Sequence, residues 1–284
     1  AELPGPIQIS VEEQTEGEIC QRQTRYVLPD GLEITWTERI FSGSNAVLQL
    51  LSFANRSDQK SGLITELMDT DLILPFSADP APVPGWRASP NHTRIISTTG
   101  SDCTRREFYP EEQIIRNGQS FSFAPTGGRS SSKLAPFFEI NQGQRGWLCA
   151  IGWTGQWQAR ISRNEAGVRL QTGIEGVAFR LLPGEQLRTS SCLLVPYSNG
   201  RTEARNAFRR LIKQHFSLIG RPGRPEHGPL CSMSWGSVPS EGMIRRIERI
   251  GQEQFGFEYL WIDAAWYGAS DGYCPSEFEG DWYT

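Results

Sequence analysis

A change of hydrophobic period near residue 200 constrains the fold of this chain more than any other feature. From Ile7 to about Pro196 the sequence consists of short runs in which apolar and polar residues alternate, as in Val47-Leu48-Gln49-Leu50. A period of two is typical of a β-strand with one wet face. Segments rich in Gly, Ser and Asn, such as 124–132, separate the runs. Because no helical pattern intervenes, the region predicts an antiparallel β-sandwich.

Individual strands are expected where β-branched, aromatic and leucine residues cluster between turns. These segments are Arg25–Val27, Leu32–Trp36, Ala46–Phe53, Thr93–Ser97, Glu107–Tyr109, Ser120–Phe123, Phe137–Ile140, Trp147–Trp153, Trp157–Ile161, Gly167–Gly173 and Cys192–Val195. The predicted fold class is therefore mainly β, with a large two-layer antiparallel sandwich over residues 1–200.

Helical spacing begins just after residue 200. In Glu203–Phe216 the apolar residues recur three or four positions apart, which predicts an amphipathic helix with one buried stripe. The following segment, 220–225, reads Gly-Arg-Pro-Gly-Arg-Pro, a composition typical of a linker. We therefore assign residues 201–225 to a helix and linker. The helix also has a basic face that we expect to be solvated, formed by Arg205, Arg209, Arg210 and Lys213.

The last part of the chain, residues 226–284, has a strand–helix–strand pattern. Leu230–Trp235 is a short strand candidate, and Ser240 is a suitable N-cap for the helix that follows. Gly256 supplies a stop signal, after which Phe257–Ile262 is an apolar run that ends on Asp263. This order predicts a βαβ unit, the element of a parallel sheet or barrel.

Composition excludes several classes of function. The 284 residues carry a net charge of −4 and no basic stripe, which argues against a nucleic-acid partner. No apolar run approaches the roughly 20 residues that span a bilayer, so no membrane partner is expected. The six cysteines contain no C-x-x-C pair, so we expect no metal and no cofactor. Cys149 and Cys192 lie within apolar runs and are expected to be buried, whereas a disulfide among the others stays open.

Two further features concern export and binding. The sequence begins with Ala1 rather than Met, so either a signal peptide was cleaved or the sequence simply starts here; the first alternative would make the protein secreted or periplasmic. Two N-x-S/T sequons, at Asn55 and Asn91, would matter only in a eukaryotic secretory pathway. Nine tryptophans are present, and tryptophan serves both large cores and flat sugar-binding surfaces.

Several segments, in order along residues 47–284, resemble family 36 of the glycoside hydrolases, the α-galactosidases or melibiases. The family's "APFF … IGWSGQW" pattern is matched by Ala135–Phe138 and Ala150–Trp157, and its "L-x-P-G-E" by Leu182–Glu185. Other segments that match are Leu51–Asp58, Leu63–Leu67, Gly128–Phe138, Ser232–Trp235, Gly256–Tyr259, Asp263–Trp266 and Gly280–Trp282. Each string alone is weak, but their common order is a strong signal.

The resemblance implies a fold and a chemistry. In that family a β-sandwich precedes a (β/α)8 barrel, so residues 226–284 would begin the catalytic barrel. The family's reaction is retaining hydrolysis of terminal α-galactosides in carbohydrate metabolism, and it needs two carboxylates about 5–5.5 Å apart. By resemblance both are Asp residues on later barrel strands. A complete barrel takes about 250 residues, so we expect no catalytic residue within this chain and no activity from it alone.

The resemblance also implies residues that bind the sugar. Trp235 and Asp263 fall at the carboxyl ends of the first barrel strands, where barrels bind ligands. Trp266 corresponds to the Trp of the family's "DDGW" motif. In that motif the second Asp is replaced here by Ala264, which leaves room for a different α-glycoside. Asp281 and Trp282 correspond to the family's "GDW". For each of these residues a structural role, in core packing or in a turn, is the alternative.

Two classes of function follow. In the first, the chain is the amino-terminal portion of an α-galactosidase-like enzyme whose partner is a carbohydrate. In the second, it is a non-catalytic sandwich that binds carbohydrate or mediates oligomerisation. The sequence leaves the oligomeric state open, including a homo-oligomer.

Overall fold

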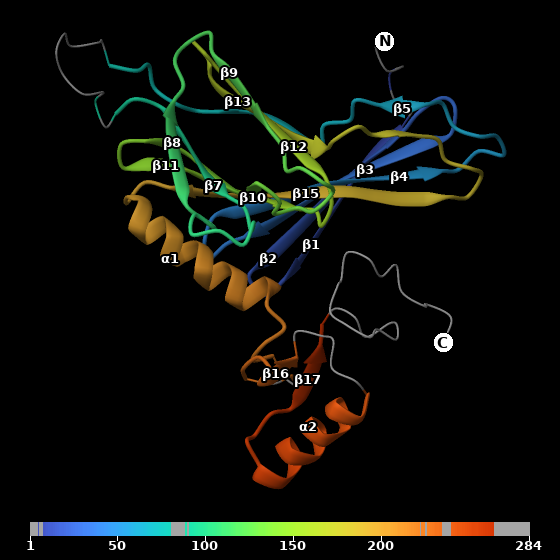
Figure 1. Ribbon diagram of the computed structural model, residues 1–284. Helices are drawn as coiled ribbons and strands as arrows, with labels where there is room; N and C mark the ends of the chain where they lie inside the picture. The colour runs from blue at the N-terminus through green and yellow to red at the C-terminus, as the bar shows by residue number, and fades with distance from the viewer. Residues whose placement is uncertain are drawn as a thin grey trace. The chain divides into compact units, whose positions relative to one another are not determined.

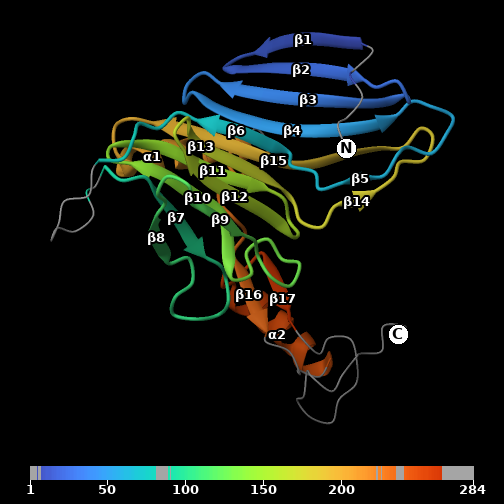
Figure 2. The ribbon, with the colours of Figure 1, turned by 90° about the horizontal axis from the view of Figure 1, so that it is seen from above.

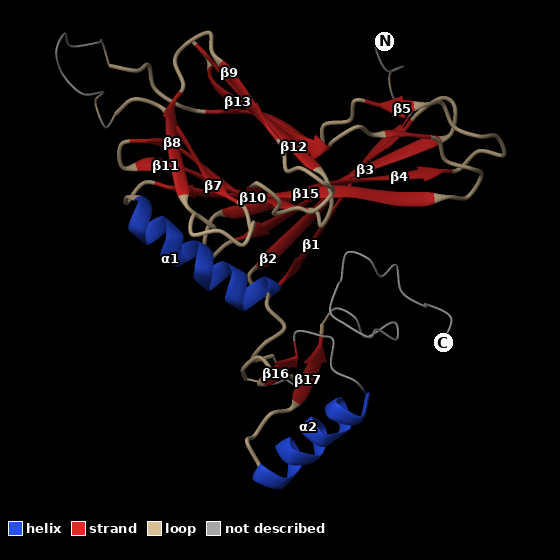
Figure 3. Cartoon of the chain, in the orientation of Figure 1, coloured by secondary structure: helices blue, strands red, loops and turns tan. Residues whose placement is uncertain are grey.

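The computed structural model describes residues 8–80, 91–221, 223–224, 226–234 and 240–263, together with the single residues 5 and 89. The chain divides into two compact units, Ala1–Leu211 and Ile212–Thr284. Figure 1 traces the chain through its elements, and Figure 3 shows that the described part of the first unit is built mostly of strands. None of the helices in the described ranges combines the length and apolar character that a membrane span requires.

The larger layer of the first unit is a nine-stranded antiparallel sheet. Its strands in spatial order are β1 (Gln8–Glu16), β2 (Ile19–Val27), β3 (Leu32–Phe41), β4 (Ala46–Asn55), β15 (Gln186–Tyr197), β11 (Arg145–Gly152), β10 (Leu134–Gln142), β7 (Arg94–Thr99) and β8 (Pro110–Ile114). Strands β1 to β4 are neighbours both in sequence and in space, whereas β15 joins them from the far end of the unit.

The second layer is a four-stranded antiparallel sheet that packs against strands β15, β11, β10 and β7 of the first. Its order is β6 (Thr70–Leu74), β13 (Gly167–Ile174), β12 (Trp157–Asn164) and β9 (Ser120–Phe123). Figure 2 shows β1 to β3 extending beyond it. A two-stranded sheet is formed by β14 (Ala178–Phe179) and β5 (Ile64–Thr65). The prediction of a large antiparallel sandwich is confirmed.

The main core lies between the two large sheets. Trp157, fully buried on β12, is its largest side chain, and the indole Nε1 donates a hydrogen bond to the Ser130 carbonyl at 2.7 Å. That bond satisfies the one polar atom of a buried tryptophan. Cys149 and Cys192 belong to the same cluster and are unpaired thiols, as their apolar surroundings predicted. All the cysteines of the described part of the chain are free.

Two strand assignments from the sequence differ from the structure. The strand predicted at Glu107–Tyr109 is wrong, because this segment is a turn in which Phe108 has a left-handed φ of 51°. The Glu107 carboxylate accepts a hydrogen bond from the Ser101 hydroxyl at 3.1 Å and so ties the loop together. Strand pairing starts later, at Pro110 of β8. β1 was not among the segments assigned as strands, although Ile9-Ser10-Val11 alternates apolar with polar residues; in the structure both apolar side chains are exposed, at 58% and 52%.

The helix predicted at Glu203–Phe216 forms in two pieces. The α-helix α1 covers Arg201–Leu211, and a π-helical turn, η1, continues over Ile212–Phe216. Leu211 is buried, as the helical period predicts, whereas Phe216 is 40% exposed. A π turn advances each residue through a smaller angle than an α turn, so it carries Phe216 away from the stripe predicted with α-helical spacing.

A buried carboxylate ties α1 to the large sheet. Glu139 of β10 is 3% exposed, and its oxygens lie 3.0 Å from Arg201 Nε and 3.4 Å from Arg205 Nη2. The Tyr197 hydroxyl donates a further hydrogen bond to Glu139, and burial together with that carboxylate raises the pKa of Tyr197. Arg201 also pairs with Glu112 at 2.7 Å. Arg205 therefore takes part in a tertiary ion pair, which corrects the prediction that it only lines a solvated helix face.

The second unit contains a βαβ element. Strand β16 (Cys231–Ser234) and strand β17 (Tyr259–Ile262) pair in parallel, and helix α2 (Ser240–Glu253) lies between them in sequence. The end of α2 is followed by left-handed backbone at Gln254 (φ 48°) and Gly256 (φ 75°), consistent with the stop signal predicted at the glycine. The predicted strand–helix–strand order is thus confirmed, while the barrel it would begin stays a prediction.

Replacing the buried carboxylate should loosen α1. We expect Glu139→Gln to lower the free energy of unfolding by about 1–3 kcal/mol, because a neutral amide cannot pair with two guanidinium groups. The two arginine side chains are 32% and 45% exposed, so water compensates for part of the loss. Urea denaturation of the first unit measures the change. The matched control is Glu203→Gln, which breaks only an exposed pair with Arg210 and should cost less than about 1 kcal/mol. Equal effects of the two changes would contradict the role assigned to Glu139.

Candidate functional site

The second unit places one predicted site residue at the end of a parallel strand. In the β16–β17 pair, Ser234 lies opposite Ile262, so the two strands end at the same level. Asp263 follows β17 directly and is half-buried. The carboxyl ends of parallel strands are where βα folds place ligand-binding residues. Of the five predicted site residues, Trp235, Trp266, Asp281 and Trp282 lie outside the described residues.

The sequence explains why Asp263 takes this position. β17 (Tyr-Leu-Trp-Ile) is short and apolar, a composition suited to a strand of a parallel sheet. Burying an ionised aspartate in a packed interior is costly, so the acidic residue stands at the carboxyl end of the strand rather than within it. There its two oxygens can accept hydrogen bonds, which is the chemistry that sugar hydroxyls require. Among the described residues no group of three or more His, Cys, Asp or Glu side chains is arranged to hold a metal ion.

The βαβ unit that carries Asp263 exposes much apolar surface. Ile244 and Ile247 of α2 are 54% and 52% exposed, and Tyr259 and Trp261 of β17 are both 62% exposed. Large apolar side chains in contiguous elements are normally covered by packing. A single βαβ unit therefore does not bury its own apolar faces.

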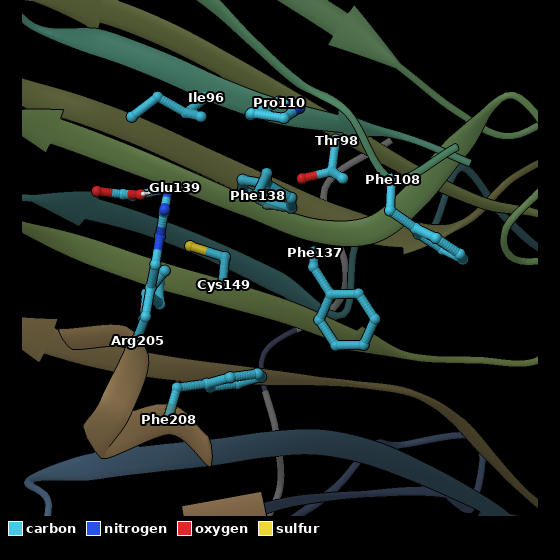
Figure 4. Close-up of a pocket in the computed structure, with 11 residues that line it drawn as sticks. Ile96, Thr98, Phe108, Pro110, Phe137, Phe138, Glu139, Cys149, Arg205 and Phe208 are labelled. Carbon is cyan, nitrogen blue, oxygen red and sulfur yellow. Dashed lines mark hydrogen bonds and ion pairs between the residues drawn. The ribbon is translucent and has the colours of Figure 1, made fainter. Parts of the chain in front are cut away.

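The first unit contains an apolar cavity of about 250 Å³ beneath α1. Figure 4 shows Arg205 reaching from α1 toward Glu139, and Phe137 facing Phe208, whose ring centroid is 6.0 Å away. The Glu139 carboxylate is already held by two arginines and a tyrosine. Burial raises the pKa of the Cys149 thiol well above its usual value, so it is a poor nucleophile. The described residues that line this cavity thus pack against one another, and none of them is suited to acid–base or nucleophilic catalysis.

The fold has been seen before in α-galactosidases. An α-galactosidase from Lactobacillus brevis superposes with a TM-score of 0.68 at 17% identity, over 96% of this chain and 35% of that one. The GH36 α-galactosidase AgaA from Geobacillus stearothermophilus, in complex with raffinose, gives 0.67 at 18% identity, over 95% and 37%. The galactosidase domain of the α-galactosidase-sucrose kinase AgaSK gives 0.68 at 12% identity, over 92% and 37%.

This chain has the fold of a region of these α-galactosidases. The resemblance to family 36 is thereby confirmed at the level of the fold, which is what identities of 12–18% can show. The chain spans about 35–37% of the length of these three structures. No protein-family model and no curated protein sequence matches the chain.

Two groups of polar residues were missed by sequence reasoning. One is the cluster around Glu139, and the other is a groove that contains Arg25, Arg56 and Arg188. In each, the residues come from segments far apart in the chain. Only the strand order β2-β3-β4-β15 brings Arg25 near Arg188, and no periodic signal within one segment could have indicated it.

The exposed apolar side chains of the second unit lead to a prediction about the local stability of β17. We expect the amide hydrogens of β17 to exchange at least about tenfold faster than those of β12, because β17 has one described partner strand and β12 lies between two. Hydrogen exchange followed by mass spectrometry measures the ratio. Strand β13, also internal to the four-stranded sheet, is the matched reference for β12. Equal protection of β17 and β12 in a monomer would contradict the prediction.

Proposed function

We propose that this chain is the amino-terminal portion of a retaining α-glycosidase that acts on terminal α-galactosides. One observation carries the proposal: nearly the whole chain, sandwich and βαβ unit together, has the fold of α-galactosidases. The structures with this fold include complexes of AgaA with raffinose and stachyose. A carbohydrate with a terminal α-galactosyl group is accordingly the substrate class that we propose.

On this proposal the βαβ unit opens a (β/α)8 barrel, and Asp263 stands at the rim of the sugar pocket. Its carboxylate would accept hydrogen bonds from galactose hydroxyls. Trp235, Trp266 and Trp282 would offer flat rings to the apolar face of the pyranose, and Asp281 a second acceptor. The position of Asp263 directly after β17 supports this arrangement.

The two catalytic carboxylates would come from later strands of the barrel, outside these residues. Retention of configuration requires one carboxylate to attack the anomeric carbon and the other to protonate the leaving oxygen, about 5–5.5 Å apart. The exposed apolar side chains of α2 and β17 support this view, because further βα units would cover them. Residues 1–211 then serve as a supporting domain.

The replacement of an acidic residue by Ala264 bears on specificity. A carboxylate at this position would accept a charge-assisted hydrogen bond worth about 1.5–3 kcal/mol. Without this carboxylate, one galactose hydroxyl would have a weaker hydrogen-bond partner. The smaller alanine would also leave room for a substituent at that position of the sugar. The enzyme we propose therefore accepts an α-galactoside or a closely related α-glycoside.

The first test concerns residues 1–284 as they stand. We expect no turnover of 4-nitrophenyl α-galactoside by the purified chain, because on this proposal neither catalytic carboxylate is present. Release of nitrophenolate, compared with a buffer blank, measures activity. Turnover that copurifies with the chain and is lost in Asp263→Ala would overturn the assignment, since a carboxylate of this chain would then perform the chemistry.

The second test concerns Asp263 in a protein that includes the complete barrel. Asp263→Asn should lower kcat/KM about ten- to two-hundred-fold, the equivalent of roughly 1.5–3 kcal/mol of transition-state binding. The melting temperature should change little, because the amide fills the same volume. A lower melting temperature with unchanged kinetics would make Asp263 a turn residue instead.

A companion variant tests the specificity of the same site. Ala264→Asp restores the acidic pair, so we expect it to shift the ratio of kcat/KM values toward unsubstituted galactosides. If Ala264→Asp leaves the ratio unchanged while Asp263→Asn lowers activity, position 264 has no part in specificity.

A further inference from the structure

A polar groove crosses the outer face of the nine-stranded sheet. Its volume is about 410 Å³, within the range of roughly 300–1,000 Å³ typical of small-molecule sites. We call it the arginine groove; its principal lining residues are Arg25, Arg56, Arg188, Glu33, Thr35 and Ser52. Ile34 and Phe53 alternate with Thr35 and Ser52 and pack in a core cluster, so the groove lies on the face turned away from that cluster.

The register of the strands determines which side chains lie next to one another at the bottom of the groove. Arg25 of β2 pairs with Thr35 of β3, Thr35 with Ser52 of β4, and Ser52 with Arg188 of β15. Two arginines thus flank two hydroxyls in one row across four strands. With about 4.8 Å between strands, the backbones of Arg25 and Arg188 are roughly 14 Å apart. Their long side chains can converge on a ligand that lies over the hydroxyls.

The charges in the groove are unbalanced. Glu33, whose side chain is 15% exposed, lies 3.1 Å from Arg56 Nη2 and 3.8 Å from Arg25 Nε. That one carboxylate is shared by two guanidinium groups. The buried Nε of Arg25 has no hydrogen-bond partner. Arg188 is exposed, and the one hydrogen bond that its guanidinium group makes to the described residues is a long one, 3.4 Å, to the Thr189 carbonyl. Three cations against one anion leave an excess of positive charge in a chain of net charge −4.

A β-bulge fixes the position of Arg188. The register of β15 against β4 shifts between Arg188 and Ser191. The Thr189 hydroxyl donates to the Leu51 carbonyl at 3.0 Å, and the Ser190 hydroxyl donates to the buried Asp69 carboxylate. A bulge re-aims the side chains beside it. Two residues of β15, Thr189 and Ser190, lie opposite the single residue Leu51 of β4. Because both are held on the core side, Arg188 is presented on a rigid part of the sheet rather than on a loop.

From this arrangement we propose that the arginine groove binds a saccharide that bears a carboxylate, such as a uronic acid unit. A planar carboxylate matches the paired N–H donors of a guanidinium group. The Thr35 and Ser52 hydroxyls would bind ring hydroxyls. A neutral sugar is usually stacked on an aromatic ring, and the one aromatic residue of the lining, Phe53, is 4% exposed. Arginine clusters also bind acidic peptide motifs, but the two hydroxyls between Arg25 and Arg188 match the ring hydroxyls of a saccharide, so we propose the saccharide as the ligand. The inference does not depend on the hydrolase activity proposed above.

The test compares two matched disaccharides on the complete chain. Isothermal titration calorimetry should detect binding of α-1,4-digalacturonate, and α-1,4-galactobiose, which differs only in its carboxylates, should bind at least about tenfold more weakly. Arg188→Gln and Arg25→Gln should each weaken digalacturonate binding about tenfold or more. Added salt should also weaken the binding of digalacturonate to the unmodified chain, because the groove is open to solvent and its charges are screened.

Two controls keep the outcome decisive. Arg39→Gln removes an exposed arginine of the same sheet face that donates to Gln21 at 2.8 Å and lies outside the groove, so it should leave binding within about twofold. Melting temperatures of the variants check the fold. Absence of saturable binding at millimolar digalacturonate, equal binding of the two disaccharides, insensitivity to both arginine variants, or tighter binding of a poly-glutamate peptide would each overturn the proposal.

Discussion

The buried carboxylate of Glu139 is the interaction on which the arrangement of the first unit depends. It lies on β10, the third strand from the β8 edge of the large sheet, and meets Arg201 and Arg205 from α1 and Tyr197 from β15. An unpaired carboxylate at 3% exposure would be strongly disfavoured. The helix must therefore begin where its arginines can reach Glu139. Because α1 directly follows β15, the ion pairs with Glu139 fix where the chain leaves the sheet and the direction in which α1 runs.

Local patterns predicted the elements well where one face of each is buried. The alternation in Trp157–Ile161 and the helical spacing after residue 200 both reflect burial on one side, and the structure contains the corresponding strand and helix. Prediction failed where burial does not set the pattern. In β1 the apolar residues Ile9 and Val11 are exposed, and their alternation stops at the polar residues that follow. At Phe108 a left-handed turn overrides the β propensity of the aromatic residues.

Polar clusters could not be predicted in the same way, because they depend on long-range pairing. The row Arg25–Thr35–Ser52–Arg188 exists only because β15 inserts beside β4, and the bulge at Thr189 shifts its register. Likewise, Arg205 looks like any other arginine of a basic helix face until the helix is docked over Glu139. The position of Asp263 at the end of an apolar run is a local signal, whereas its role in sugar binding rests on the resemblance to family 36 and stays a prediction.

The outer face of the nine-stranded sheet divides into two regions of different chemistry. Next to α1, Phe137 and Leu193 provide apolar surface that the helix helps to cover. Beyond the helix, the strands β2 to β4 present hydroxyls and arginines on the same side of the sheet. A sheet of uniform function would have one apolar face and one wet face along its whole length. Solubility does not require three arginines around one glutamate. Guanidinium groups that lack a carboxylate partner repel one another, and this repulsion lowers the stability of the fold. That cost is the physical argument for an anionic ligand at this part of the sheet.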